Sequence, residues 1–254
     1  MKAQRTARLA ALTAALGLLL GGCSRAPVID GDEPKQPVFP AAYVVPKDLQ
    51  PVEKIGDPWQ GLNKAIYRFN YRFDKYVLLP AVIGYKKITP NFVEKGVHNF
   101  FTNFRNFTVI FNSLLQFSGT KTVQTTGRLL VNSTVGLAGL FDPATPMGIP
   151  QHNEDFGQTL GRWGVPTGPY IVVPLFGPSN VRDATGLLVD FVVYGYVREQ
   201  LLSPGTEWRA VWTIMLAIDT RAHVNFLYYQ TGSPWEYELV RTLYTTKREL
   251  DVEK

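Results

Sequence analysis

The sequence predicts a mainly α-helical protein with one folded domain, interrupted by a long ordered loop that is rich in proline and glycine. In the body of the chain, apolar residues recur at steps of three and four, which is the spacing of one face of a helix. Capping side chains followed by proline, as at Asp57-Pro58 and Thr89-Pro90, are typical of helix starts. Seven prolines within residues 142–180 predict that no regular helix runs through that segment.

Residues 1–22 have the three parts of a secretory signal. A positively charged start precedes an uncharged apolar run from Leu9 to Leu20, and Gly21 and Gly22 are the small residues that a signal peptidase needs before its cut. The apolar run is shorter than the ~20 residues that a helix needs to cross a bilayer. We therefore interpret this segment as an address that is removed from the mature protein.

Cys23 is the one cysteine in the chain, so it cannot form an internal disulfide. It ends the run LLLGGC, in which Leu20 stands three places before it with two glycines between. This arrangement predicts a lipoprotein that is cut before Cys23 and acylated there, with an S-diacylglyceryl group and an N-acyl chain. By resemblance to bacterial lipoproteins, a residue other than Asp at Ser24 favours sorting to the outer membrane.

Charge and composition limit the possible functions. The formal net charge of +5 falls once the signal is removed, because Lys2, Arg5 and Arg8 leave with it. The remaining chain offers no electrostatic case for binding nucleic acid. Aromatic residues make up 13% of the chain, which is typical of surfaces that are partly apolar and partly wet. No segment after Cys23 has the pattern of a simple spanning helix, so membrane contact is expected to lie within the interface.

The first expected elements are a tether and a helix. Residues 23–56 hold six prolines and few periodic apolar residues, which predicts an extended, semi-rigid tether. The folded body is expected to span residues 57–254. Its first helix begins with Asp57 as N-cap and ends at Pro80. The apolar face of that helix comprises Leu62, Ile66, Phe69, Phe73 and Tyr76.

The second expected helix follows Pro90 and is dense in phenylalanine as far as Phe117. Its apolar positions spread beyond one stripe, which fits either a buried helix or a helix that faces lipid, and periodicity cannot separate the two. A third helix is expected from Thr120 through residues 135–140. Two glycines three places apart in that last stretch would permit a close helix contact.

The loop of residues 142–180 carries too many apolar side chains for a solvated linker, so it is expected to pack on the body or on lipid. Residues 187–197 follow as a short apolar helix, although their β-branched residues also allow a strand. A further helix is expected from Ser203 or Thr206 to about Tyr229. The last helix starts at the capping box SPWE, residues 233–236, and ends in a charged, frayed terminus.

Metal ligands with recognisable spacing are absent from the sequence. Its three histidines, His98, His152 and His223, are spread along the chain, and none has the close spacing of a zinc pair on one helix. The polar cluster at residues 151–155 could hold a cation, but a solvated turn is the preferred interpretation. We expect no metal and no cofactor.

A membrane-facing hydrolase is the enzyme alternative. A serine nucleophile elbow needs glycine two places before and two places after the serine. Ser179 has only the first of these glycines, and Ser118 has neither at that spacing. We therefore expect no catalytic residues and no enzyme.

The long motif EDFGQTLGRWGV at residues 154–165 resembles the hallmark of the MlaA (also called VacJ) lipoproteins. Further motifs in the same order extend the resemblance over residues 57–249. They are DPWQGLN at 57–63, YRFN at 67–70, GPY at 168–170, PLFGPS at 174–179, RD at 182–183 and IDTRA at 218–222. Motifs this long and in this order are highly specific.

The resemblance implies a ring of helices that lies in the outer membrane around an amphipathic channel. It implies that phospholipids misplaced in the outer leaflet are the cargo, that a soluble periplasmic lipid carrier receives them, and that a trimeric porin is a partner. The alternatives are a porin-associated structural lipoprotein and, less favoured, a membrane-lipid hydrolase. The loop of residues 142–180 either shapes the channel rim or braces the fold. Candidate residues for the lipid path or its rim are Phe69, Phe156, Trp163, Tyr170, Arg182 and Asp183.

Overall fold

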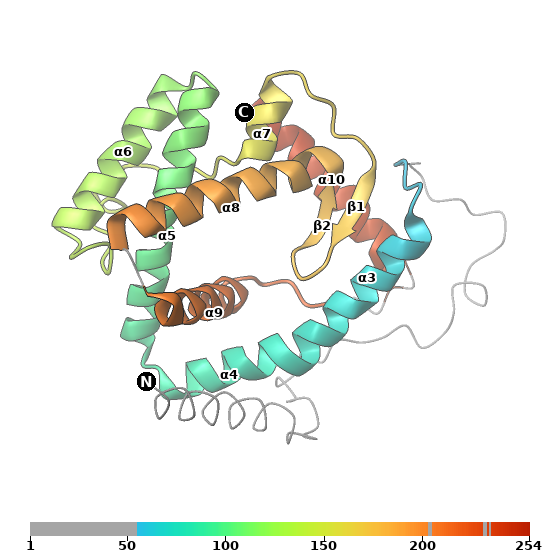
Figure 1. The fold of residues 1–254 in the computed structure, drawn as a ribbon, viewed down its shortest axis with the longest axis horizontal. Helices are drawn as coiled ribbons and strands as arrows, with labels where there is room; N and C mark the ends of the chain where they lie inside the picture. Colours follow the sequence, from blue (N-terminus) through green and yellow to red (C-terminus); the bar gives the residue numbers. More distant parts are fainter. Residues whose placement is uncertain (1–54, 203–204, 231–232, 234) are drawn as a thin grey trace, which may run out of the picture. The chain divides into compact units, whose positions relative to one another are not determined.

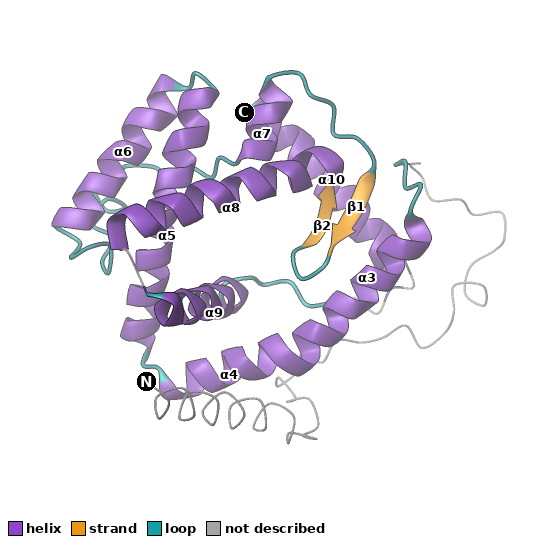
Figure 2. Ribbon diagram, viewed as in Figure 1, coloured by secondary structure: helices purple, strands orange, loops and turns teal. Residues whose placement is uncertain are grey.

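The structure is a computed structural model that describes residues 55–202, 205–230, 233 and 235–254. Figure 2 shows that helices dominate this part of the chain and that its strands form one small sheet, which confirms the mainly α class. The signal of residues 1–22, Cys23 and the tether up to residue 54 lie outside the described residues, as do Ser203, Gly232 and Pro234.

The elements follow one another in the order shown in Figure 1. They are α3 (Gln60–Phe73), the π-helical turn η1 (Asp74–Leu78), α4 (Leu79–Ile88), α5 (Asn91–Leu115), α6 (Gly119–Thr134), α7 (Phe156–Arg162), β1 (Tyr170–Val173), β2 (Gly177–Asn180), α8 (Val181–Leu202), α9 (Thr206–Ala222) and α10 (Glu236–Glu253). Helix α5 packs against both α6 and α9, and α7 packs against both α8 and α10.

The first helical segment differs from expectation at both ends. Helix α3 begins at Gln60 with no side-chain cap, so the prediction that Asp57 caps it is wrong. Asp57 instead accepts hydrogen bonds from Asn63, Tyr237 and Arg241. Pro80 does not end the helix either, because the π-turn η1 precedes it and places Pro80 in the first turn of α4, where no backbone N–H is required.

The phenylalanine-rich helix α5 is buried at its centre and exposed at its ends. Phe101 and Phe104 are buried against Trp212 of α9, with ring centroids 5.3 and 5.1 Å from the indole. Phe92 near the start of α5 and Phe117 just after its end are exposed. The centre of α5 therefore fits the interpretation of a buried helix, and contact of its exposed ends with lipid stays a prediction.

Helix α6 ends at Thr134, so the expectation that it continues through residues 135–140 is wrong. Leu137, Ala138 and Gly139 all have left-handed backbones, with φ of 51, 58 and 91°. This turn brings Gly139 so close to α5 that a Cβ there would lie 2.7 Å from the Asn103 side chain. The glycine therefore serves a tight turn against α5 instead of a helix–helix contact.

The proline-rich segment 142–180 contains a helix and a hairpin, so the prediction that no regular helix runs through it is wrong. Helix α7 fits between Pro150 and Pro166 and is capped by Asp155, whose carboxylate accepts a hydrogen bond from the Gln158 N–H at 2.8 Å. The hairpin pairs β1 with β2 in antiparallel register, from Tyr170 opposite Asn180 to Val173 opposite Gly177.

Two asparagines of α3 cover the free edge of β1. Asn63 donates to the Tyr170 carbonyl at 3.1 Å and accepts from the Val172 N–H at 2.9 Å. Two helical turns later, Asn70 donates to the Val173 carbonyl at 3.0 Å and accepts from the Leu175 N–H, just beyond the strand, at 2.8 Å. Because these bonds replace the missing neighbouring strand, α3 and the hairpin form one unit. A cluster of Tyr67, Tyr170, Val172 and Tyr237 is packed beside them.

Helix α8 confirms the helical prediction for residues 187–197 and excludes the strand. It runs from Val181 to Leu202, longer than expected, because Arg182 and Asp183 form its buried first turn. Helix α9 begins at Thr206 as predicted but ends at Ala222, and the chain then continues as turns. Helix α10 runs to Glu253, so the expectation of a frayed end is wrong.

Candidate functional site

In the described part of the chain, polar side chains are buried and large apolar side chains are exposed, which is the reverse of the distribution in soluble proteins. Its buried polar and charged residues outnumber its buried apolar ones, and large apolar side chains are exposed on nearly every helix. Soluble monomers bury apolar side chains first, and an exposed apolar surface of this extent marks contact with membrane or protein. The described surface therefore has the character of one that contacts a membrane or other proteins.

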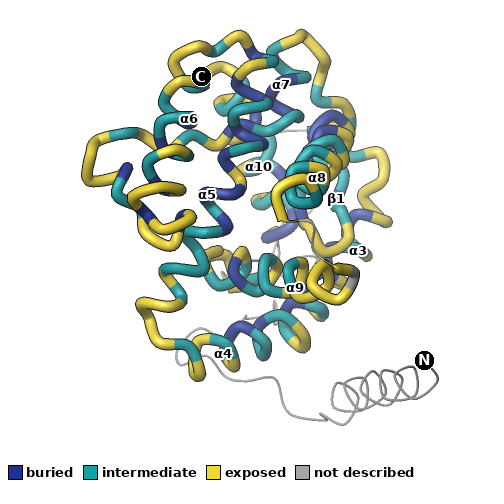
Figure 3. Tube along the Cα trace, turned by 60° about the vertical axis from the view of Figure 1, so that its left-hand side comes forward, coloured by how far each residue is buried: buried dark blue, intermediate teal, exposed yellow. Residues whose placement is uncertain are grey.

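The exposed apolar residues form continuous helical faces. On α8, Leu188, Val192 and Tyr196 are spaced four apart and all are exposed, with Val192 at 71%. On α9, Trp208, Val211 and Ile214 are exposed at steps of three. Figure 3 shows exposed positions recurring along both helices. None of the helices in residues 55–254, as far as they are described, is long and apolar enough to cross a membrane.

Polar groups fill the space where α5, α7 and α8 meet. Asn112 of α5 donates to Asp190 of α8 at 2.8 Å and accepts from the Thr159 hydroxyl of α7 at 3.0 Å. Gln116 donates to the same hydroxyl at 3.1 Å, and the second Asp190 oxygen accepts the Phe156 N–H at 3.0 Å. Burial raises the pKa of Asp190 to about 6, although its hydrogen bonds act in the opposite direction.

A second polar cluster is built around Arg248 of α10. Its guanidinium donates to both oxygens of Asp155, at 2.7 and 2.8 Å, and to Asp183 at 2.7 Å. Arg182 and Tyr244 also donate to Asp183, at 3.0 and 2.9 Å. Burial alone would raise the pKa of both carboxyl groups, but Arg248 holds the pKa of Asp155 and of Asp183 below the ordinary value. The cluster joins α7, α8 and α10.

Glycines permit the close approach that this cluster needs. A Cβ on Gly157 would lie 2.6 Å from the Asp183 carboxylate, and a Cβ on Gly186 would lie 2.3 Å from the backbone nitrogen of Gly157. A Cβ on Gly161 would lie 2.7 Å from Val252 of α10. The glycines of the motif at residues 154–165 therefore fix how α7 packs between α8 and α10.

The predicted lipid-path residues fall into two groups. Phe69 and Trp163 are about half exposed, and Phe156 is partly buried, stacked at 6.4 Å from Phe111. The other three candidates, Tyr170, Arg182 and Asp183, are buried. The interior position of Arg182 and Asp183 supports the brace interpretation of the segment, and the role of all six in a lipid path stays a prediction.

The polar cluster at residues 151–155 has protein partners. Glu154 pairs with Lys121 at 2.6 Å, His152 lies 2.7 Å from the Gln124 side-chain oxygen, and Asp155 caps α7. Burial, followed by the charge of Lys121, lowers the pKa of His152. Each charged group therefore has a protein partner, and because Glu154 is buried, the interpretation of a solvated turn is wrong for that residue.

The sequence did not identify the residues that form the exposed apolar faces or those at the centre of the buried polar clusters. The spacing of Leu188, Val192 and Tyr196 was visible in the sequence, but only the packed structure shows that this face is uncovered. Asp190 and Arg248 carried no local signal, because their partners are far away in the chain: Asn112 is 78 residues from Asp190 and Asp155 is 93 residues from Arg248.

Comparison with known proteins gives one consistent result. The family model described as MlaA lipoprotein matches residues 55–251. A protein of Escherichia coli named intermembrane phospholipid transport system lipoprotein MlaA is 31% identical over 198 residues, covering 74% of this chain and 75% of that protein. The protein of Haemophilus influenzae with the same name is 30% identical over 178 residues, covering 69% and 70%.

Other matches are partial or structural. A protein of Rickettsia felis is 37% identical over 149 residues, which cover 59% of this chain and 58% of that protein, so the match spans less than two thirds of its length. A solved structure described as the structural basis for maintenance of bacterial outer membrane lipid asymmetry superimposes with a TM-score of 0.60 at 27% identity. It covers 77% of this chain and 98% of its own.

Proposed function

Because the chain belongs to the MlaA lipoprotein family, we propose that it is an outer-membrane lipoprotein that removes misplaced phospholipids from the outer leaflet. In this proposal the lipids pass through an amphipathic channel to a soluble periplasmic carrier, and a trimeric porin holds the protein in place. The names of the Escherichia coli and Haemophilus influenzae relatives support phospholipid transport. The lipid-asymmetry structure with the same fold supports the outer membrane as the location.

The observation that carries the proposal is the reversed distribution of polar and apolar side chains. Helices that lie in a bilayer expose apolar faces to acyl chains, and their buried polar groups must be satisfied within the protein. The exposed faces of α8 and α9 fit the first condition, and the hydrogen bonds of Asp190 and Arg248 fit the second. A protein with this surface can hold acyl chains and head groups in separate environments.

Passive transport is favoured over lipid hydrolysis. Ser179 is buried and its hydroxyl donates to the neighbouring Asn180 carbonyl at 3.3 Å. Among the described residues, no hydrogen bond connects Ser179 or Ser118 with a histidine, as a nucleophile and its base would require. The proposed conduit forms no covalent intermediate and needs no cofactor for transport, so lipid gradients and the carrier set its direction.

Deleting the gene should increase the phospholipid exposed in the outer leaflet, and wild-type protein should restore the original level. Replacing the exposed pair on α8 with Leu188→Asp and Val192→Asp should fail to restore it, because each charge costs about 2.5–3.5 kcal/mol within a bilayer. Outer-leaflet phospholipid is measured by enzymatic labelling of intact cells.

The matched control is the pair Leu188→Val and Val192→Leu, which keeps the face apolar and should restore the wild-type level. Equal restoration by the aspartate pair would contradict the embedded surface. Unchanged outer-leaflet phospholipid in the deletion strain would contradict transport altogether and favour the porin-associated scaffold. Release of fatty acid or lysophospholipid by the purified protein would favour the hydrolase.

We propose that Cys23 carries the lipid anchor. A Cys23→Ala variant should lose its acyl chains and leave the outer-membrane fraction, because each buried methylene contributes about 0.8 kcal/mol to membrane binding. A Ser24→Ala variant, which leaves the acylation site intact, is the control and should remain in that fraction. Membrane fractionation with mass spectrometry of the N-terminus measures both properties, and full outer-membrane retention of Cys23→Ala without acylation would contradict the anchor.

A further inference from the structure

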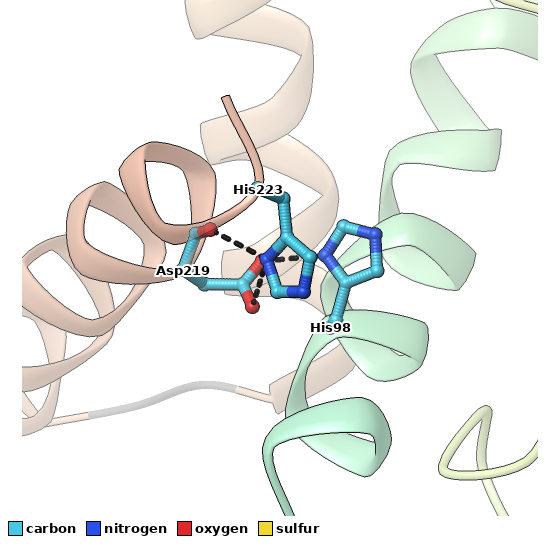
Figure 4. Close-up of side chains that lie close together, drawn as sticks. All are labelled: His98, Asp219 and His223. Carbon is cyan, nitrogen blue, oxygen red and sulfur yellow. Dashed lines mark hydrogen bonds and ion pairs between the residues drawn. The ribbon is translucent and has the colours of Figure 1, made fainter. Parts of the chain in front are cut away.

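Two of the three histidines meet at one buried carboxylate. His98 comes from α5, whereas Asp219 and His223 come from the end of α9 and its cap. The imidazole rings stack with centroids 3.7 Å apart, and both Nδ1 atoms lie beside the Asp219 carboxylate (Figure 4). Asp219 and His223 are four residues apart, but the sequence does not connect them with His98, which is 121 residues from Asp219.

The carboxylate at the centre has an incomplete set of partners. Asp219 is only 3% exposed, and its Oδ1 accepts no hydrogen bond among the described residues. Its Oδ2 lies 3.1 Å from His98 Nδ1, and its Oδ1 lies 3.5 Å from His223 Nδ1. A buried carboxylate is normally paired with a cation or bound to a metal. Two positively charged rings would repel at this separation, whereas one divalent ion can be shared by both neutral rings.

We propose that His98, Asp219 and His223 form a binding site for a divalent transition-metal ion, with Zn²⁺ as the ion that fits best. Two imidazoles and one carboxylate are a common protein ligand set for zinc, and the fourth position is open to water. The three side chains offer ligand atoms that all lie within 4.8 Å of one another.

The two nitrogen–oxygen distances suit a tetrahedral ion, but the stacked rings must turn apart to bind it, because the in-plane lone pairs of two nearly parallel rings do not converge on one ion. Bonds of about 2.0–2.1 Å around zinc place neighbouring ligand atoms roughly 3.3–3.4 Å apart. The measured nitrogen–oxygen separations of 3.1 and 3.5 Å lie on either side of that value. Binding replaces the hydrogen bond that His223 Nδ1 donates to the Asp219 main-chain carbonyl at 2.9 Å, so one neutral hydrogen bond is exchanged for a metal–nitrogen bond.

The position of the site suggests what the ion does. His98 and His223 keep 38% and 31% of their side chains exposed, so an ion can reach them from outside. The same region already connects α9 with its neighbours through Arg221, which donates to both oxygens of Asp74. A metal bridge would therefore fasten the end of α9 to α5.

Zinc titration of the purified full-length chain tests the site. The protein is prepared in detergent without a histidine tag, stripped with a chelator and titrated with Zn²⁺ against a chromogenic zinc chelator. One ion per chain should bind, and His98→Ala and His223→Ala should each weaken the affinity at least about 100-fold. Zn²⁺ should raise the melting temperature of the wild type but not of either variant.

The control is His152→Ala, which removes the third histidine and should leave the affinity unchanged. Binding of Co²⁺ should give the visible absorption of a four-coordinate ion in the wild type, and His98→Ala should lose it. His98 is part-exposed, so its variant should fold, which circular dichroism checks. The absence of saturable binding of one ion, or equal affinity in the wild type and His98→Ala, would overturn the site. These measurements do not depend on lipid transport, so they can fail while the proposed function holds.

Discussion

Gly186→Ala should destabilise the protein by about 3 kcal/mol or more, because the new methyl group has no place to go. A Cβ at this position would lie 2.3 Å from the backbone nitrogen and 2.7 Å from the Cα of Gly157. Main-chain atoms cannot rotate away as a flexible side chain can, so α7 and α8 must separate. That separation would also disturb Asp183 in the neighbouring turn and its bonds to Arg248. Chemical unfolding followed by circular dichroism in detergent measures the loss.

The same helix provides a control for this prediction. A Cβ on Gly195 of α8 would have open space around it, with no other atom within 4 Å, so alanine fits there. Gly195→Ala should be neutral or should stabilise the protein by up to about 1 kcal/mol, because alanine favours helix more than glycine does. Equal stability of Gly186→Ala and Gly195→Ala would show that the α7–α8 contact does not limit the fold.

Local patterns in the sequence predicted most helices but not their interruptions. Apolar spacing located the helices at residues 60–73 and 91–115, because a helix with one apolar face repeats at steps of three and four whether that face is buried or exposed. Pro80 misled the prediction, because a π-turn immediately before a proline removes the clash that normally ends a helix. Proline density likewise hid α7, whose short span between two prolines is stabilised by its Asp155 cap and its packing.

The candidate site depended on contacts that a single sequence does not show. Gly157 stands in the hallmark motif, but the sequence does not show that a Cβ on Gly186 of α8 would lie against its backbone. The histidine spacing argued against a metal pair on one helix, yet α5 and α9 bring His98 and His223 together. In both cases the local spacing described a single helix, whereas the contact is made between residues of two helices.

Arg248→Met should cost about 3–5 kcal/mol of stability at neutral pH, because it removes the guanidinium that bridges Asp155 and Asp183 and leaves Arg182 as the remaining guanidinium partner of Asp183. In the wild type, Arg248 holds the pKa of Asp155 and Asp183 below the unfolded value of about 4, against the effect of burial. Their contribution to stability is therefore present above about pH 4 and is lost as the pH falls through the lowered folded-state pKa values.

In the Arg248→Met variant the pKa of both carboxyl groups should rise relative to the wild type, because Arg248 is the strongest of the partners that act against burial, while Arg182 still donates to Asp183 and Gln158 to Asp155. The cost of burying the two charged carboxylates is then largest at neutral pH, and it decreases as the carboxyl groups become protonated toward pH 4. The difference in stability between wild type and variant should therefore shrink on acidification.

Lys247→Met is the matched control: its side chain is 70% exposed and pairs with Asp251 on the surface, so its loss should change stability by less than about 0.5 kcal/mol. Unfolding curves at pH 7 and pH 4 measure both variants. A cost for Arg248→Met that equals that of Lys247→Met, or that stays constant between the two pH values, would show that the cluster around Arg248 does not hold α7, α8 and α10 together.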